Sequence, residues 1–301
     1  DFSGWGQVFG VAATFAVAQA IEGYVLTPRI VGNRVGLNQL ETLVAILVVA
    51  LVLSVAALGW GQGGDGLPGG KPALGLLPTP PEILRQFPQA RRLAFKALRL
   101  KGSVDLSAQM PPVGSQGGMG SCASWASSYY YKAFQEGKEQ GWDFGSDAQR
   151  ISPAFAYNLL NGGDGDSDTS LGVNFIILKQ RGACSWQSMP YVNGDCTSWP
   201  SVGAWREAMY YRAQSSAYIF SWFDNPADFI DDMKAHLDGG DVFVIGIPVY
   251  SDFQNIGSWP GYVYDGPRPD ATYKGGHGLC VVSYDDSKAV GGAFKFVNSW
   301  G

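Results

Sequence analysis

The chain has 301 residues, which is enough for two domains with a substantial hydrophobic core. It carries 21 basic and 26 acidic residues, so no overall positive field attracts nucleic acid. Only 16% of the residues are charged, and 41 are glycine. This composition fits a loop-rich exported protein attached to an apolar segment better than an all-helical cytosolic protein.

The first 38 residues differ in composition from the rest of the chain. They are apolar and rich in alanine and glycine from Val8 to Val25, and residues 22–32 read EGYVLTPRIVG. The latter stretch resembles a segment near the C-terminal end of the autoinducer exporter family of multi-helix membrane proteins. The resemblance stops near Leu37, and the rest of such a transporter is absent. We therefore interpret residues 1–38 as a transporter-like remnant of a fusion or join, with a transport role as the alternative.

The next segment, residues 39–60, contains an almost unbroken apolar run from Leu43 to Trp60. Its length suits a short transmembrane span or a long signal-peptide core, with a buried helix as the alternative. Arg29 and Arg34 precede the run, so the positive-inside rule places the N-terminus in the cytoplasm. We expect a membrane-anchored or exported protein whose following domain lies on the extracytoplasmic side.

Residues 61–102 have the composition of a linker. Residues 61–66 are glycine-rich and flexible, and residues 68–81 are rich in proline, glycine and leucine. Residues 81–101 are basic and suit a short helix. Two interpretations of this basic part stay open: a solvated spacer, or a pro-segment or surface that contacts anionic lipid.

A glycine-rich turn, residues 116–121, leads to Cys122 at the start of a predicted helix that Gly137 ends. The helix dipole and the unpaired N–H groups at this end favour a thiolate over a thiol. Gln116 lies upstream in the same turn. Its side-chain amide and the Cys122 N–H suit a pair of donors for an oxyanion.

A nucleophilic cysteine needs a base, and the base needs a group that orients it. His277 is one of only two histidines and precedes an apolar run that predicts a buried strand. A short alternating strand further on ends at Asn298, which Trp300 follows. An asparagine carbonyl oxygen can hold one imidazole nitrogen so that the other faces the sulfur.

The order Gln, Cys, His, Asn, with the QGxxGSC-type loop and the NSWG ending, resembles the papain-like cysteine peptidases, in particular their bacterial branch. The resemblance covers about residues 103–301. It implies an α+β, two-domain fold with a helical half carrying Cys122 and a β-barrel-like half carrying His277 and Asn298, preceded by hydrophobic helices. It also implies a cysteine endopeptidase without cofactor, in which Gln116 stabilises the oxyanion and Trp300 shields the histidine–asparagine bond.

The chain departs from this family at several points. Met119 stands where many members have a disulfide-bonded cysteine, and Ala123 follows the nucleophile where tryptophan is usual. The family continues past the residue equivalent to Gly301, so we expect the domain to be incomplete at its C-terminus. Two other functions stay open: a catalytically silent peptide-binding module on a membrane anchor, and a transglutaminase-like enzyme, which would want an aspartate orienter.

Further residues complete the predicted site. By position in the family, Asp168, Ser170 and Leu171 should edge the substrate cleft. Cys184 and Cys196 flank a loop with proline and glycine, and outside the cytoplasm we expect them to form a disulfide. Cys280 is expected to be a small buried hydrophobe, and no metal site is expected. The acidic loop at 162–170 lacks the glycine and glutamate that an EF-hand calcium loop requires. A zinc site would require CxxC pairs or more histidines.

Overall fold

The computed structural model describes residues 73–90, 100–162, 165–258 and 260–301. These belong to one compact unit, residues 63–301. The transporter-like segment 1–38 and the apolar run 43–60 lie outside the described residues. Among those that are described, no helix is long and apolar enough to cross a membrane.

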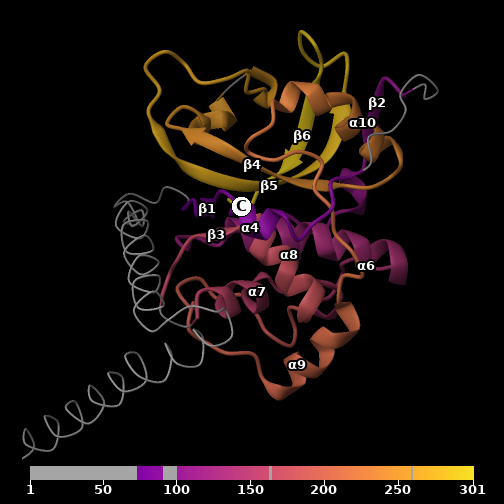
Figure 1. The fold of residues 1–301 in the computed structure, drawn as a ribbon, viewed down its shortest axis with the longest axis vertical. Helices are drawn as coiled ribbons and strands as arrows, with labels where there is room; N and C mark the ends of the chain where they lie inside the picture. Colours follow the sequence, from indigo (N-terminus) through magenta and orange to yellow (C-terminus); the bar gives the residue numbers. More distant parts are fainter. Residues whose placement is uncertain (1–72, 91–99, 163–164, 259) are drawn as a thin grey trace, which may run out of the picture. The chain divides into compact units, whose positions relative to one another are not determined.

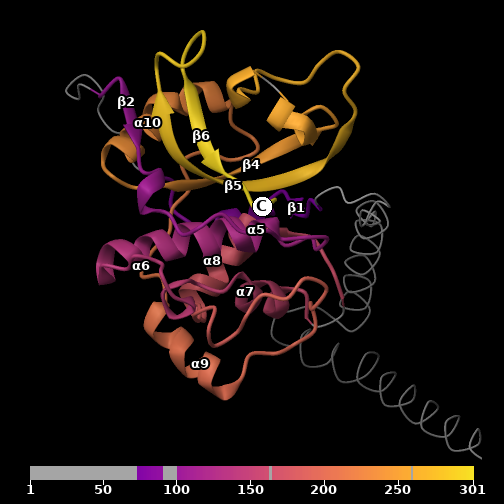
Figure 2. The same ribbon diagram turned by 180° about the vertical axis from the view of Figure 1, so that it is seen from behind.

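The unit has a helical half and a sheet half, which Figures 1 and 2 show from opposite sides. The helical half contains α5 (Cys122–Ser124), a π-helical stretch (Trp125–Lys132), α6 (Ala133–Gln140), α7 (Pro153–Leu160), α8 (Leu171–Gln180) and α9 (Val202–Ala208). The sheet half contains β2 (Ser103–Asp105), α10 (Ile230–Asp238), β4 (Phe243–Tyr250), β5 (Tyr273–Asp285) and β6 (Ala293–Val297). The predicted division into a cysteine-bearing helical half and a strand-rich half matches this arrangement.

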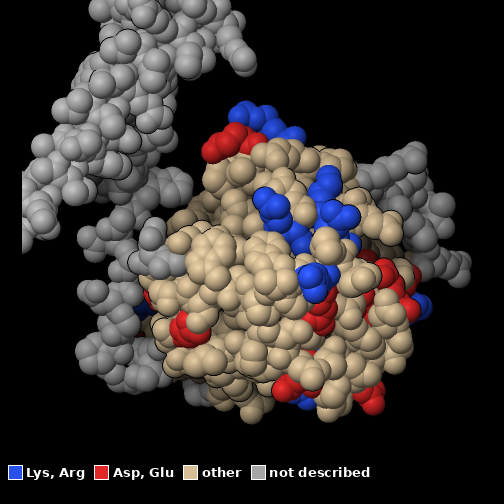
Figure 3. Space-filling model, turned by 90° about the horizontal axis from the view of Figure 1, so that it is seen from below, with Lys and Arg blue, Asp and Glu red and all other residues tan. Residues whose placement is uncertain are grey.

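Three short elements lie where the two halves meet: β1 (Leu76–Leu77), α4 (Pro81–Leu84) and β3 (Thr169–Ser170). Short 3₁₀ helices occupy the connections, at Ser107–Gln109, Asp147–Gln149, Met209–Tyr211, Pro226–Phe229, Phe253–Ser258 and Pro260–Tyr262. The lower face of the helical half, opposite the sheet, is mostly uncharged, with a group of Lys and Arg side chains on it (Figure 3).

The strands of the sheet half surround β5. All its neighbours run antiparallel to it: β4 and β2 follow one another along one edge, and β6 pairs with the other. No pairing joins β6 to β4 or β2 within the described residues. The predicted barrel-like half is therefore an open sheet in the part of the chain that the structure describes. The register places Ile247 opposite His277 and Val297 opposite Cys280.

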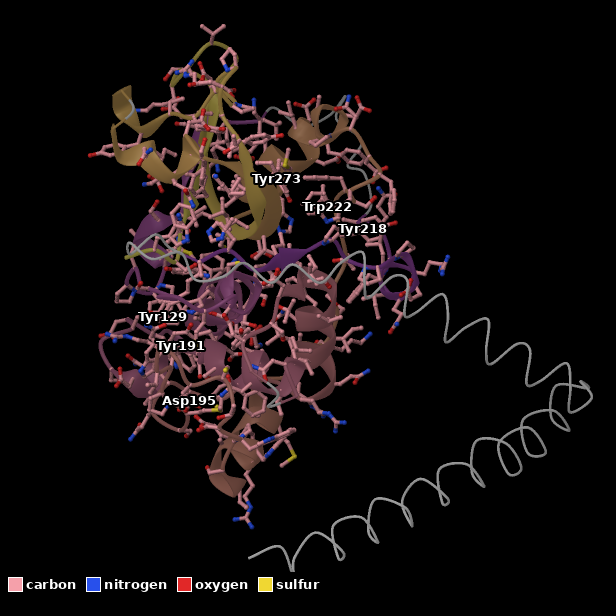
Figure 4. The ribbon with its side chains drawn as sticks, turned by 90° about the vertical axis from the view of Figure 1, so that its left-hand side faces the viewer. Tyr129, Tyr191, Asp195, Tyr218, Trp222 and Tyr273 are labelled. Carbon is pink, nitrogen blue, oxygen red and sulfur yellow. The ribbon has the colours of Figure 1, made fainter. Side chains whose placement is uncertain are left out.

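The helix that carries the cysteine packs through an aromatic cluster. Trp125 is 1% exposed, and its ring centroid lies 4.7 Å from that of Tyr129 and 5.0 Å from that of Tyr191. Figure 4 shows both tyrosines in the helical half. Burial of such large rings supplies much of the hydrophobic free energy of a core. The cluster therefore fixes the helix whose first residue is the cysteine.

This helix ends later than the sequence predicts. It continues through Gly137 to Gln140, and Gly141 takes the left-handed conformation that ends it, with φ 69°. Gly137 serves packing instead, because a Cβ there would lie 2.6 Å from the Phe144 ring.

Candidate active site

Cys122 is the first residue of α5, as the sequence predicts. The backbone N–H groups of Ser124 and Trp125 both donate to the Ser121 carbonyl, which starts the helix directly before the cysteine. The side-chain hydroxyl of Ser121 is hydrogen-bonded to the hydroxyl of Tyr191 at 2.7 Å. The thiol is therefore held between the start of a helix and the aromatic cluster, and it is fully buried.

His277 reaches the site from the middle of β5. Next to it, a Cβ at Gly278 would lie only 3.2 Å from the Cys122 carbonyl oxygen, so the strand backbone touches the start of the helix. The imidazole Nε2 lies 2.7 Å from Asn298 Oδ1. Its Nδ1 is buried and has no hydrogen-bond partner. The ring is thus oriented through one nitrogen and leaves the other available.

Trp300 covers this histidine. Its ring centroid lies 4.6 Å from that of His277, at an interplanar angle of 31°. The Asn298 backbone is fixed from the helical half, because the Tyr130 hydroxyl donates to its carbonyl at 2.8 Å. Trp300 therefore packs on His277 and Tyr130 anchors Asn298, the two partners of the 2.7 Å hydrogen bond.

Gln116 is fully buried beside the same groups. Its Oε1 accepts from the Ser299 hydroxyl at 2.7 Å, and its backbone N–H donates to the Ser299 carbonyl at 2.7 Å. Its amide Nε2 donates to the carbonyl oxygens of Met119 at 2.8 Å, Ala73 at 3.0 Å and Leu74 at 3.3 Å. The amide thus binds peptide carbonyl oxygens, which is the property an oxyanion donor needs.

Two of those carbonyls belong to residues 73–77, which we call the covering segment. Its β1 pairs in parallel with β3, Leu76 opposite Thr169, and the Thr169 N–H donates to the Gly75 carbonyl at 3.0 Å. On the other side the Gly75 N–H donates to the Gly276 carbonyl at 3.4 Å. Part of the predicted linker therefore lies as an extended strand across the candidate site.

Burial shifts the pKa of Cys122 and of His277, in each case away from the charged form. Desolvation raises the pKa of Cys122 to about 12, opposed by a hydrogen bond from the Gly278 backbone and reinforced by the charge of Asp168. Desolvation lowers the pKa of His277 to about 4, against the hydrogen bond to Asn298. Both shifts favour the uncharged thiol and the uncharged imidazole over the thiolate–imidazolium pair that the helix N-terminus alone favours.

The three predicted cleft-edge residues all lie beside the covering segment. Ser170 is in β3, and Leu171 packs against the cluster of Leu76, Cys122 and Ala123. Asp168 Oδ1 lies 2.9 Å from where a Cβ of Gly120 would be. Burial, and then the charge of Asp166, raise the pKa of Asp168.

The predicted disulfide is absent from the structure. Cys184 and Cys196 both carry free thiols. Cys184 is fully buried in the main core, and Cys196 packs against that core from a partly exposed position. The loop between them is held by other means, since the Gly194 N–H donates to the Met119 sulfur and the Asn158 amide to the Asp195 carbonyl at 3.4 Å. Cys280 is a fully buried core residue.

Sequence reasoning missed the covering segment and Ser299. The leucines of the segment follow no helical or strand period. Ser299 belongs to the NSWG motif, in which the sequence analysis assigned roles only to Asn298 and Trp300. The glycines that the segment touches are a sequence signal for it, because they stand where a side chain would collide with the segment. Cβ atoms at Gly246 and Gly276 would lie 2.4 Å from Leu76 Cδ2 and 2.3 Å from the Leu76 carbonyl oxygen.

The comparisons with known proteins point to one fold. No protein-family model and no curated protein matches the chain. Among solved structures, the chain resembles xylellain, a cysteine protease from Xylella fastidiosa, at 24% identity and a TM-score of 0.61, over 77% of this chain and 86% of that one. It also resembles digestive procathepsin L2 from the larval midgut of Tenebrio molitor, at 18% identity and a TM-score of 0.56, over 77% of this chain and 69% of that one. The chain thus has the fold of the papain-like cysteine proteases.

Proposed function

We propose that the chain is a cysteine peptidase with Cys122 as nucleophile, His277 as general base and acid, and Asn298 as the residue that orients the histidine. One observation carries the proposal. His277 is held at Nε2 by Asn298 and leaves a buried Nδ1 unpartnered, on a strand that touches the first turn of the Cys122 helix. This arrangement supports the roles of nucleophile, base and orienter in covalent catalysis.

The catalytic steps follow from these positions. When the covering segment leaves, both groups regain water, and transfer of the thiol proton to Nδ1 gives a thiolate and an imidazolium. The thiolate attacks a peptide carbonyl, whose oxygen then takes the place of the Ala73 and Leu74 oxygens at Gln116. His277 gives the proton to the leaving amine and then takes one from the water that releases the acyl group.

The covering segment itself is not a good substrate for this chemistry. It buries the thiol as a neutral group, and Leu76 packs directly against Cys122 and Ala123. The form described here is therefore a closed one, and activity requires the segment to leave. The neutral pair also favours one alternative, a peptide-binding module that never forms the thiolate.

Covalent labelling of the full-length chain separates the two functions. We would treat the chain and its Leu76→Asp variant with an epoxysuccinyl peptide, which reacts with an activated thiolate, and map the adduct by mass spectrometry. The expected result is one adduct on Cys122 in the variant, at a slower rate in the unchanged chain. A folded Leu76→Asp variant that gains no adduct would overturn the peptidase proposal, and Cys122→Ala in the same background gives the blank.

A further inference from the structure

Helix α9 turns large apolar side chains toward solvent. Its inner side carries Ala204 and Ala208, which are fully buried in the main core. Its outer side carries Val202, and Met209 and Tyr210 follow in the next 3₁₀ helix. Each of these three side chains is more than half exposed. A surface helix normally covers its outer side with polar residues, and adjoining exposed apolar residues mark a contact surface.

Trp199 extends this surface from the loop before the helix. It stands two positions before the N-cap residue Ser201 and is also more than half exposed. The backbone on both sides of the ring is fixed. The Asn158 amide donates to the Ser198 carbonyl at 2.9 Å, and the Ser201 hydroxyl accepts a backbone N–H of the first helical turn at 3.1 Å. We call the four exposed side chains the apolar face: Trp199, Val202, Met209 and Tyr210.

Two arginines lie within this face and at its end. Arg206 stands four residues after Val202 and four before Tyr210, so it lies between them on the outer side of α9. Arg212 directly follows the 3₁₀ helix, and its Cγ would lie 3.0 Å from a Cβ at Gly182, just beyond the end of α8. Both side chains are exposed. The apolar face is therefore not electrically neutral.

The end of α8 adds two more cations near this face. The Ala213 N–H donates to the Leu178 carbonyl at 2.9 Å, which holds the chain after α9 against the end of α8. Lys179 and Arg181 come next after Leu178, and both are exposed. Within the described residues, no ion pair joins any of the four cations to a carboxylate. Figure 3 looks onto the end of the molecule where Figure 1 places α9, and it shows Lys and Arg side chains grouped there on a mostly uncharged surface.

The acidic residue of α9, Glu207, is turned inward. One of its carboxylate oxygens is buried and has no hydrogen-bond partner. Burial, and then the charge of Glu207, raise the pKa of the Cys184 thiol, which lies in the core. The outer side of α9 thus combines apolar side chains with positive charge and carries no carboxylate. In a chain with 26 acidic and 21 basic residues, this combination is a local property of the surface.

Exposed apolar side chains among unpaired cations are complementary to the surface of an anionic bilayer. Tryptophan and tyrosine rings settle at the level of the lipid headgroups, and lysine and arginine bind the lipid phosphates. The sequence adds a second argument. Residues 61–72 separate the apolar run 43–60 from the first described residue, and this length of chain spans at most about 40 Å. A membrane anchor in that run would keep the described unit within reach of the bilayer surface.

We propose that α9 docks this unit on an anionic membrane surface, with the apolar face among the headgroups and the four cations on lipid phosphates. Cys122 lies where the two halves meet, and α9 lies at the end of the helical half away from the sheet (Figures 1 and 2). Docking therefore leaves the candidate active site clear of the membrane. The inference does not depend on the proposed function.

Oxidative footprinting of the full-length chain tests the proposal. Hydroxyl radicals modify exposed tryptophan, methionine and tyrosine side chains, and peptide mass spectrometry gives the rate at each. The chain is compared in phosphatidylcholine vesicles and in the same vesicles with one third phosphatidylserine. We expect the anionic vesicles to lower the rates at Trp199, Met209 and Tyr210 by about fivefold or more. Tyr262 and Tyr273, which are as exposed but lie in the sheet half, should keep their rates.

Reversing two charges should remove this protection. Each cation near an anionic surface strengthens binding by about fivefold, so Arg206→Glu combined with Arg212→Glu should weaken docking by about 25-fold or more. Lys274→Glu combined with Lys288→Glu is the matched control, because it makes the same change of charge at exposed positions of the sheet half. Near-UV circular dichroism checks the fold of both variants. High salt should weaken the protection of the unchanged chain, since it screens exposed charges.

The outcomes separate the membrane from other occupants of the face. Protection that is equal in the two kinds of vesicle, or absent from both, overturns the proposal. Protection that appears without vesicles and grows with protein concentration overturns it too, because it identifies a second copy of the chain as the occupant. Protection that persists in the double arginine variant contradicts the role of charge. Failure of Cys122 to react with the epoxysuccinyl peptide bears only on the proposed function.

Discussion

Cys122 and Cys280 are both fully buried, and in both cases burial raises the pKa of the thiol. They differ in what buries them. Cys280 lies within the main core on β5. Cys122 is covered by Leu76, from a short segment that bonds to Gly117, Thr169 and Gly276 and to the Gln116 amide. Burial by a core ends only when the unit unfolds, whereas burial by one short segment ends by local opening. The two thiols therefore have equal exposed fractions but are buried by different parts of the structure.

The largest expected effect separates the two thiols by function. Cys122→Ala should lower turnover by on the order of 10⁴-fold or more, because no other group can form the acyl intermediate. Cys280→Ala should keep turnover and lower the free energy of unfolding by about 1 kcal/mol through a small cavity. Peptide hydrolysis and urea unfolding of both variants provide the measurement. An equal loss of turnover in Cys122→Ala and Cys280→Ala would show that the two thiols do not differ in function.

Opening the covering segment should change only one thiol. Leu76→Asp places a charge in an apolar site and should speed the reaction of Cys122 with iodoacetamide by about 10- to 100-fold, the equivalent of losing the burial of one leucine. The reaction of Cys280 should not change. Pro78→Asp is the matched control, since Pro78 is exposed two residues further along. Peptide mapping over time reports each thiol separately.

Acid should destabilise the closed site. Burial lowers the pKa of His277 to about 4 from its ordinary 6.5, so between these pH values the unfolded chain binds the proton and the folded one does not. Stability then falls as the pH drops through this window, by on the order of 1–3 kcal/mol from this group. Urea unfolding at pH 7 and 4.5 measures it. His277→Gln should remove that part of the pH dependence, and an unchanged dependence would contradict the assignment.

The smallest expected effect is the loss of turnover when His277 loses the side chain that orients it. Asn298→Ala removes the 2.7 Å hydrogen bond to His277 Nε2 but leaves Trp300 stacked on the ring. We expect turnover to fall by about tenfold, the value of one hydrogen bond, and therefore far less than for Cys122→Ala. Steady-state kinetics of the two variants give the ratio. A loss as large as that of the nucleophile would make Asn298 a reacting group.

The places of Cys122, His277 and Asn298 in the fold were predictable because each follows a local pattern. A cysteine at a helix start, a histidine on a buried strand and an asparagine at a strand end each have a sequence signature. The covering segment has none, since Leu74, Leu76 and Leu77 owe their places to contacts with residues far along the chain. The disulfide prediction failed for a related reason: spacing cannot show that Cys184 lies in a core that its partner only borders.

The loop of Gln116 is held by residues 299–301. Besides the two bonds to Ser299, Ser115 forms a β-bridge with Trp300, and the Gly301 N–H donates to the Gly114 carbonyl at 3.2 Å. These contacts span more than 180 positions, and the loop-closure entropy of such separations slows folding. During synthesis the covering segment and Cys122 both leave the ribosome well before residues 299–301, which hold the loop of Gln116. A nascent chain thus carries its covering segment and its thiol before the contacts that hold this loop form.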